Sequence, residues 1–385
     1  MPNSDFHSMQ AWRHDIHQHP ELGFEEDRTS DKVANLLESF GIEVHRGIGG
    51  TGVVGVLTKG DGDKRIGIRA DMDALKIHEQ NTFAHCSAHE GKMHACGHDG
   101  HTSMLLGAAQ YLAQCGNFDG TVVFIFQPAE EHGQGAKSMI ADGLFERFPV
   151  DSVYAIHNFP SLDMGHFAVR EGPIMASEDN FEITIKGVGH HAAMPHLGRD
   201  PIVVAAQIIT AMQSLVARTV DPVENAVVSF TEIHTNGTVN VVPSEVTLKG
   251  DTRSLIPEVQ NTIESTMQRI VEGTCKAHGV EFEFDYQRNF ASTINTPREA
   301  EIAAAVAIDL VGAERVRGDS KPIMGSEDFG YMLQSKPGAY LLLGNGTGEI
   351  GGCSLHNPRY DFNDEILTIG ADFWIAMVES QLPAQ

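Results

Sequence analysis

The hydrophobic residues of this chain follow two different periods. Between Asp27 and Gly41 they recur at helical spacing, which predicts a helix that ends at Gly41 in a left-handed cap. The residues of that apolar face are Val33, Leu36, Leu37 and Phe40. Four short runs are instead apolar throughout, as in strands buried on both faces of a parallel sheet. These runs are Arg65–Ala70, Thr121–Phe126, Ser152–Ile156 and Ala339–Leu343.

Acidic or imidazole side chains follow each of the four predicted strands. They are, in chain order, Asp71 and Asp73, then Glu130 and Glu131, then His157, and, after a longer glycine-rich loop, His356. In open α/β sheets, ligands bind outside the carboxyl ends of the strands. The sequence therefore predicts a functional site at this edge of the sheet.

The segment from residue 179 to residue 287 has a different pattern. Alternation at Phe181, Ile183 and Ile185 predicts a half-exposed strand, and Asp200-Pro201 predicts the start of a helix. Two or three strands, a helix over Pro257–His278 and a last strand follow, which gives the β-α-β-β-α-β order of a ferredoxin-like unit. We expect an inserted α+β lid and dimerisation domain at residues 179–287.

The rest of the chain is expected to form one discontinuous domain. Residues 1–178 and 288–385 should make an α/β catalytic domain with a mixed, largely parallel sheet and helices on both faces. The length of 385 residues exceeds the usual size of a single core, which agrees with two domains.

Charge and cysteine usage limit the partners. The chain has 52 acidic and 27 basic residues and a net charge of -25, which argues against nucleic acid or an anionic membrane as a partner. The five cysteines are scattered, so reduced thiols and a cytoplasmic location are expected. No targeting segment is evident, and no apolar stretch is expected to approach the roughly 20 residues of a membrane helix.

The densest group of reactive residues is the octapeptide His94-Ala95-Cys96-Gly97-His98-Asp99-Gly100-His101. A cysteine and a histidine two residues apart can bind one transition metal through thiolate and imidazole. Asp99 is expected to hold a ring N–H of a ligand. The alternative is a polar loop whose histidines cap the next helix.

Other motifs add candidate residues. The adjacent carboxylates of Gln127-Pro128-Ala129-Glu130-Glu131 repel each other and need a cation, and we assign Glu131 as a metal ligand and Glu130 as the general base. His157 and His356 are further candidate ligands, although His356 could be an ordinary surface histidine. One imidazole of His190-His191 or His196 could donate to an oxyanion, or these could be surface histidines.

With these motifs together, the chain resembles the amidohydrolase branch of the aminoacylase/carboxypeptidase metallopeptidase family, which includes hippurate hydrolases and indole-3-acetyl-amino-acid hydrolases. The resemblance covers nearly the whole length. Besides the motifs above, it is carried by Arg13–Leu22, Arg69–Leu75, Gly189–His196, Asn240–Pro243, Met324–Phe329 and Leu355–Pro358.

The resemblance implies a dinuclear site with two divalent metal ions per subunit, held by Cys96, His98, Glu131, His157 and His356. It implies Glu130 as general base, His191 as the lid histidine, and Asn240 and Arg253 as substrate-binding residues. Where metallopeptidase relatives have a metal-binding His-x-Asp, this chain has Asp71-Met72-Asp73, and we expect these two carboxylates to orient ligands from behind. Zinc, manganese, cobalt and nickel all suit such donors.

The predicted activity is metal-dependent hydrolysis of the amide of an N-acyl amino acid, a small-molecule substrate whose acyl group stays open. A homodimer or higher homo-oligomer through the lid domain is expected. A metallo-dipeptidase or carboxypeptidase acting on unblocked peptides would use the same ions. A noncatalytic metal-binding protein would have no need for Glu130 or His191.

Overall fold

The computed structural model describes residues 5–384, which belong to two compact units. The first unit comprises Met1–Ile174, Ile294–Lys321 and Asp328–Gln385. The second comprises Met175–Thr293 and the short segment Pro322–Glu327.

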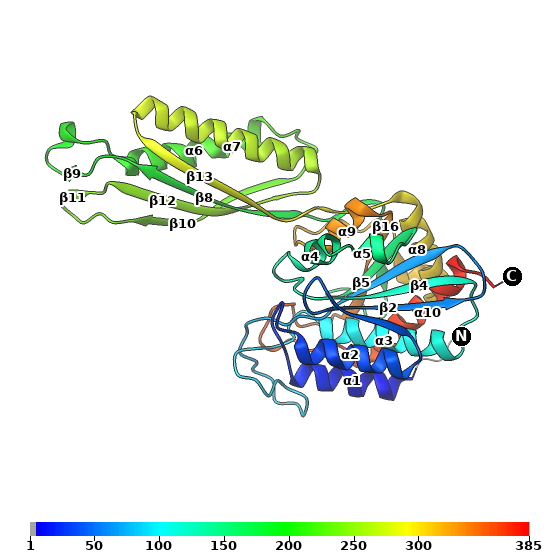
Figure 1. Cartoon of the computed structure of the whole chain (residues 1–385). Helices are drawn as coiled ribbons and strands as arrows, with labels where there is room; N and C mark the ends of the chain where they lie inside the picture. Colours follow the sequence, from blue (N-terminus) through cyan, green and yellow to red (C-terminus); the bar gives the residue numbers. More distant parts are fainter. Residues whose placement is uncertain (1–4, 385) are drawn as a thin grey trace. The chain divides into compact units, whose positions relative to one another are not determined.

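An eight-stranded mixed sheet forms the centre of the first unit (Figure 1). Its strands in spatial order are β1 (Glu43–Ile48), β2 (Gly52–Lys59), β4 (Gly120–Gln127), β3 (Arg65–Asp71), β5 (Ser152–Pro160), β16 (Gly338–Gly346), β6 (Phe167–Ala168) and β15 (Val316–Arg317). The four central strands β4, β3, β5 and β16 run parallel to one another. They are the four strands predicted from apolar runs, and the expected mixed, largely parallel sheet is confirmed.

Helices cover both faces of this sheet (Figure 1). One face packs on α1 (Phe6–Gln18), α2 (Asp27–Ser39), α3 (His98–Gln114), α8 (Pro297–Val311) and α10 (Leu367–Gln381), which share one hydrophobic core with the strands. The other face carries α4 (Gly135–Ala141), α5 (Leu144–Arg147) and α9 (Phe329–Ser335). Because both faces are covered, every residue of β4 is buried.

The second unit is a four-stranded antiparallel sheet with two helices. The strands lie in the order β10 (Ala226–Thr235), β12 (Glu245–Ser254), β8 (Ser177–Lys186) and β13 (Glu281–Phe290). In β12, buried residues alternate with less buried ones, since only one face packs on α6 (Pro201–Arg218) and α7 (Pro257–His278). This is the predicted ferredoxin-like arrangement.

Several short elements complete the two units. They are β7 (Gly172–Met175), β9 (His190–His191), η1 (Pro195–Leu197), β11 (Val241–Val242), β14 (Thr293–Asn295), η2 (Ala313–Arg315) and η3 (Asp364–Ile366). The pair β9 and β11 places His191 opposite Val241, the neighbour of Asn240.

Helix α6 has a strongly apolar sequence. Its 18 residues, Pro201–Arg218, are long and apolar enough by length and composition to cross a membrane, a test that core helices of globular proteins also pass. In the second unit, α6 buries Val204, Ile208, Met212 and Leu215 against the sheet. Ile202, Val203 and Val216 are exposed, so α6 is apolar beyond the face that packs on the sheet.

Candidate metal centre

The carboxyl ends of the parallel strands bring the expected side chains to one edge of the first unit. Asp71 ends β3, and Glu130 and Glu131 follow β4. His157 lies within β5 rather than after it, because pairing with β16 continues as far as Pro160. The loop after β16 returns to this edge, where the N–H of His356 donates to the carbonyl oxygen of Ala95 at 2.8 Å.

The reactive octapeptide forms the start of helix α3. Gly97 is the N-cap and has φ +99°, a left-handed conformation that glycine adopts without a steric penalty. The chain therefore turns sharply between Cys96 and His98. His98 and His101 follow at the first turn of the helix, three residues apart and thus on one face.

Five side chains converge next to this helix start. The Sγ of Cys96 lies 3.4 Å from Nε2 of His157. Oε1 of Glu131 lies 3.9 Å from Nε2 of His98 and 3.4 Å from Nε2 of His356. Ligand atoms of Cys96, His98 and Glu131 all lie within 4.8 Å of one another, which is close enough for one ion to contact the three.

Two buried atoms in this group make no hydrogen bond within residues 5–384. They are Nε2 of His98 and Oε1 of Glu131. A buried polar atom without a partner is costly, and a metal ion is one partner that would remove the cost. The donor set, one thiol, three imidazoles and a carboxylate, is also one that suits divalent transition metals.

The pKa shifts in the cluster also favour a bound cation. Burial opposes a charge on His98, but the carboxylates of Asp71 and Asp73 outweigh it and raise the pKa of His98 to about 10. Burial and the neighbouring Glu131 raise the pKa of the Cys96 thiol well above its usual value. The cluster thus has an excess of negative groups, which favours a positive charge at its centre. A proton on His98 supplies that charge, and a bound metal cation could supply it instead.

The candidate ligand rings of His98 and His157 are each oriented by a hydrogen bond at Nδ1. Nδ1 of His98 lies 3.1 Å from Oδ1 of Asp73, and the N–H of Glu131 donates to the other oxygen of Asp73 at 3.0 Å. Nδ1 of His157 lies 2.6 Å from the carbonyl oxygen of Asn158 and donates to it. In both rings Nε2 is therefore left facing the cluster, as in metal-binding histidines.

Asp71 has a different set of partners. Its Oδ2 accepts from the buried guanidinium of Arg69 at 2.7 Å, and its Oδ1 lies 2.6 Å from Nδ1 of His101. His101 in turn accepts from the N–H of Asn158 at 2.9 Å. The sequence analysis did not select three of these residues, His101, Arg69 and Asn158, as site residues. Of the three, only His101 could have been indicated, by its position in the octapeptide.

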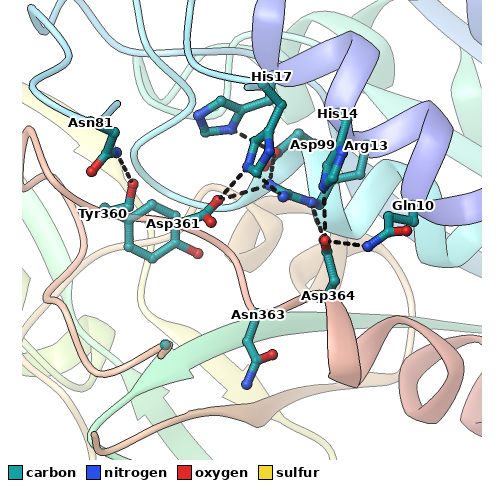
Figure 2. A network of polar contacts seen from close by, with 12 residues as sticks. Gln10, Arg13, His14, His17, Asn81, Asp99, Tyr360, Asp361, Asn363 and Asp364 are labelled. Carbon is teal, nitrogen blue, oxygen red and sulfur yellow. Dashed lines mark hydrogen bonds and ion pairs between the residues drawn. The ribbon is translucent and has the colours of Figure 1, made fainter. Parts of the chain in front are cut away.

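Asp99 does not hold the ring of a candidate ligand, contrary to expectation. Its Oδ2 lies 2.8 Å from Nδ1 of His17 and accepts from Arg13 at 3.1 Å, both on α1 (Figure 2). Arg13 also pairs with Asp361 and Asp364 of the carboxyl-terminal region. Successive side chains on a helix point about 100° apart, so Asp99 faces α1 while His98 faces the cluster.

The residues expected on the lid lie in the second unit. The Nδ1 of His191 accepts from the N–H of Ala193 at 3.1 Å, so the proton of the neutral ring is on Nε2. The carbonyl oxygen of Asn240 accepts from the N–H of Ala192 at 3.0 Å. Arg253 pairs with the carboxylates of Glu178 and Asp251, at 2.8 and 2.9 Å. Their roles toward the cluster stay predictions.

Comparison with known proteins identifies the class to which this fold and cluster belong. Residues 67–380 match the model of peptidase family M20/M25/M40, and the chain belongs to this family. It is 42% identical over 362 residues to the hippurate hydrolase of Campylobacter jejuni, covering 94% of this chain and 93% of the relative. It is 37% identical over 378 residues to the N-acetylcysteine deacetylase of Bacillus subtilis, covering 97% of each.

A solved structure shows the same fold over the whole length. The crystal structure of a Bacillus subtilis protein described as a dinuclear metal binding peptidase of the M20 family has a TM-score of 0.84 and 33% identity to this chain. The match covers 99% of each chain. The resemblance inferred from the motifs is confirmed.

Proposed function

We propose that this chain is a metal-dependent amidohydrolase that cleaves the amide bond of N-acyl amino acids and releases a carboxylic acid and a free amino acid. The names of the two curated relatives support this substrate class, since hippurate and N-acetylcysteine are both N-acyl amino acids. The observation that carries the proposal is the position of Glu130. Its Oε2 lies 3.9 Å from Nε2 of His98, the unpartnered nitrogen that also faces Glu131.

In this proposal Cys96, His98, Glu131, His157 and His356 hold two divalent ions, with zinc, manganese, cobalt and nickel as the metals that fit. When bound, such ions polarise the amide carbonyl and lower the pKa of water toward roughly 7. Asp73 keeps the His98 ring in place through Nδ1. Asp71 contacts Nδ1 of His101 and forms an ion pair with Arg69. These two carboxylates therefore orient the site and are not assigned as ligands.

Glu130 carries the proton transfers. Its carboxylate takes a proton from the attacking water and returns it to the leaving nitrogen, so that the amine departs neutral. The Nε2–H of His191 is assigned to donate to the oxygen that gains negative charge. Asn240 and Arg253 are assigned to bind the substrate, and Arg253 would exchange part of its pairing with Glu178 or Asp251 for the substrate carboxylate.

We further propose a cytoplasmic homodimer formed through the second unit. The five free cysteines fit a reducing compartment, and the exposed edge strands β10 and β13 of the four-stranded sheet offer surfaces on which a second copy could pair. Sedimentation of the purified chain would test the dimer.

The variant Glu130→Gln tests the assigned base. It should bind metal like the unchanged protein and lose about 100- to 10,000-fold in kcat on N-acetyl and N-benzoyl amino acids, because an amide accepts no proton. An active Glu130→Gln protein would show that the base is wrongly assigned. In the same assay, faster cleavage of unblocked dipeptides than of their N-acylated forms would favour the peptidase alternative.

A further inference from the structure

A buried carboxylate outside the predicted site contacts the turn that presents Glu130 and Glu131. Glu26 precedes α2 and is 0% exposed. Although it occupies the N-cap position, its side chain makes no cap hydrogen bond to the helix. Instead, Oε1 accepts from the N–H of Ala129 at 2.8 Å and Oε2 accepts from the hydroxyl of Thr51 at 2.5 Å.

The turn that Glu26 contacts has an unfavourable backbone conformation. Ala129 has φ +49°, a left-handed conformation that a residue with a Cβ rarely adopts. Such a conformation persists only where surrounding contacts impose it. The N–H of Gly135 donates to the carbonyl oxygen of Ala129, and that of Gly133 to the carbonyl oxygen of Glu130, so the turn is closed tightly on the side that leads to α4.

Two carboxylates hold the backbone on the two sides of Glu130. Glu26 accepts the N–H of the residue before it, Ala129, and Asp73 accepts the N–H of the residue after it, Glu131. The segment around Glu26 also lies directly against the turn, since a Cβ at Gly23 would come within 3.0 Å of the Cα of Ala129. With both neighbouring amides fixed, the directions of the two acidic side chains are fixed as well.

We propose that Glu26 is a positioning residue: by accepting the N–H of Ala129 it sets the turn that aims Glu130 at the substrate and Glu131 at the metal. This inference rests on the proposed function, because it takes Glu130 as the base and Glu131 as a ligand. Burial raises the pKa of Glu26 to about 7. Its positioning contact survives either protonation state, because a carboxylate and a carboxyl group can both accept from an amide.

The variants Glu26→Ala and Glu26→Asp test the contact. Alanine removes the acceptor, and aspartate keeps the charge but is one methylene too short to reach both partners. We expect each to weaken metal affinity, measured by competition with a chelator, by about 10- to 100-fold, as for other groups that orient ligands. We expect kcat to fall by a similar factor with little change in KM, because alignment of the base is lost rather than substrate binding.

Glu26→Gln is the conservative rescue. Its amide oxygen can still accept from Ala129, and its NH2 group can donate to the Thr51 hydroxyl, so metal affinity and kcat should be close to those of the unchanged protein. Glu21→Ala is the matched control. The Glu21 carboxylate accepts from the N–H groups of Arg28 and Thr29 and so caps the same helix, and its hydrogen bonds within residues 5–384 go to this helix rather than to the turn. It should lower stability but leave metal affinity and kcat nearly unchanged.

The outcomes separate this inference from the proposed function. If Glu26→Ala and Glu26→Asp match Glu21→Ala in metal affinity and kcat, or if Glu26→Gln is as impaired as Glu26→Ala, the positioning role is wrong. If Glu26→Ala does not fold, Glu26→Asp decides alone. An active Glu130→Gln protein would instead overturn the proposed base, and the metal affinities of the Glu26 variants would then decide the inference by themselves.

Discussion

Replacing Gly97 by alanine should damage the metal centre through a clash at the start of α3. A Cβ at this position would lie 2.2 Å from Oδ1 of Asn158 and 2.7 Å from the hydroxyl oxygen of Tyr360. Neither group can withdraw freely. Asn158 donates from Nδ2 to the Tyr360 hydroxyl at 2.5 Å, and its Oδ1 lies 2.8 Å from Nε2 of His101.

The cost has two parts. A residue with a Cβ at φ +99° costs about 1–2 kcal/mol in backbone strain. Moving Asn158 or Tyr360 away breaks a buried hydrogen bond, which costs about 1–3 kcal/mol more. We therefore expect Gly97→Ala to lower the free energy of unfolding of the first unit by about 2–5 kcal/mol.

Gly91→Ala is the matched control, because Gly91 has φ +78° but no atom within 4 Å of the added Cβ. It should cost only the strain, about 1–2 kcal/mol. Urea unfolding followed by tryptophan fluorescence measures both variants in the first unit, since the two tryptophans, Trp12 and Trp374, lie there. Equal destabilisation by the two substitutions would refute the argument that Gly97 is required by its contact with Asn158 and Tyr360.

Two further predictions concern the protonation of the buried His17 and the contacts that Asp73 makes with two candidate ligands. Burial opposes protonation of His17, but Asp99 raises its pKa from 6.5 to about 9, so the folded chain keeps a proton that the unfolded chain releases. The resulting stability is complete below pH 6.5 and should be lost by about pH 9, by up to about 3 kcal/mol, in urea titrations. His17→Gln should remove this loss, and an equal pH slope in both proteins would contradict the prediction. Asp73→Asn should weaken metal affinity by about 10- to 100-fold in chelator competition, because His98 and Glu131 contact different oxygens of Asp73 and an amide replaces one of them with a donor; unchanged affinity would contradict this prediction.

The parts of the site that could be predicted are those set by local sequence and by the geometry of parallel strands. Apolar runs indicated the four central strands, and the residues that follow a strand's carboxyl end must lie at one edge of the sheet. Cys96 and His98 could be selected because two strong ligands stand close together around a glycine. For these residues, position along the chain nearly determines position in space.

The parts that could not be predicted depend on contacts between distant segments. Nothing in the sequence around Glu26 indicates that its side chain turns away from α2 to meet Ala129, a residue 103 positions further along the chain. The partner of Asp99 was wrongly predicted for the same reason, since it depends on how α1 packs against α3. Which residues of α6 pack in the core likewise depends on the sheet that lies against this helix.

We propose above that side chains from β5, from the loops after β4 and β16, and from the start of α3 hold paired divalent ions. Anomalous diffraction from crystals of the zinc-loaded protein tests it directly. We expect two anomalous peaks per chain, contacted by Cys96, His98, Glu131, His157 and His356, with Glu130 beside them and not coordinated to either peak. Peaks elsewhere, or a loaded protein in which these five side chains contact no ion, would contradict it.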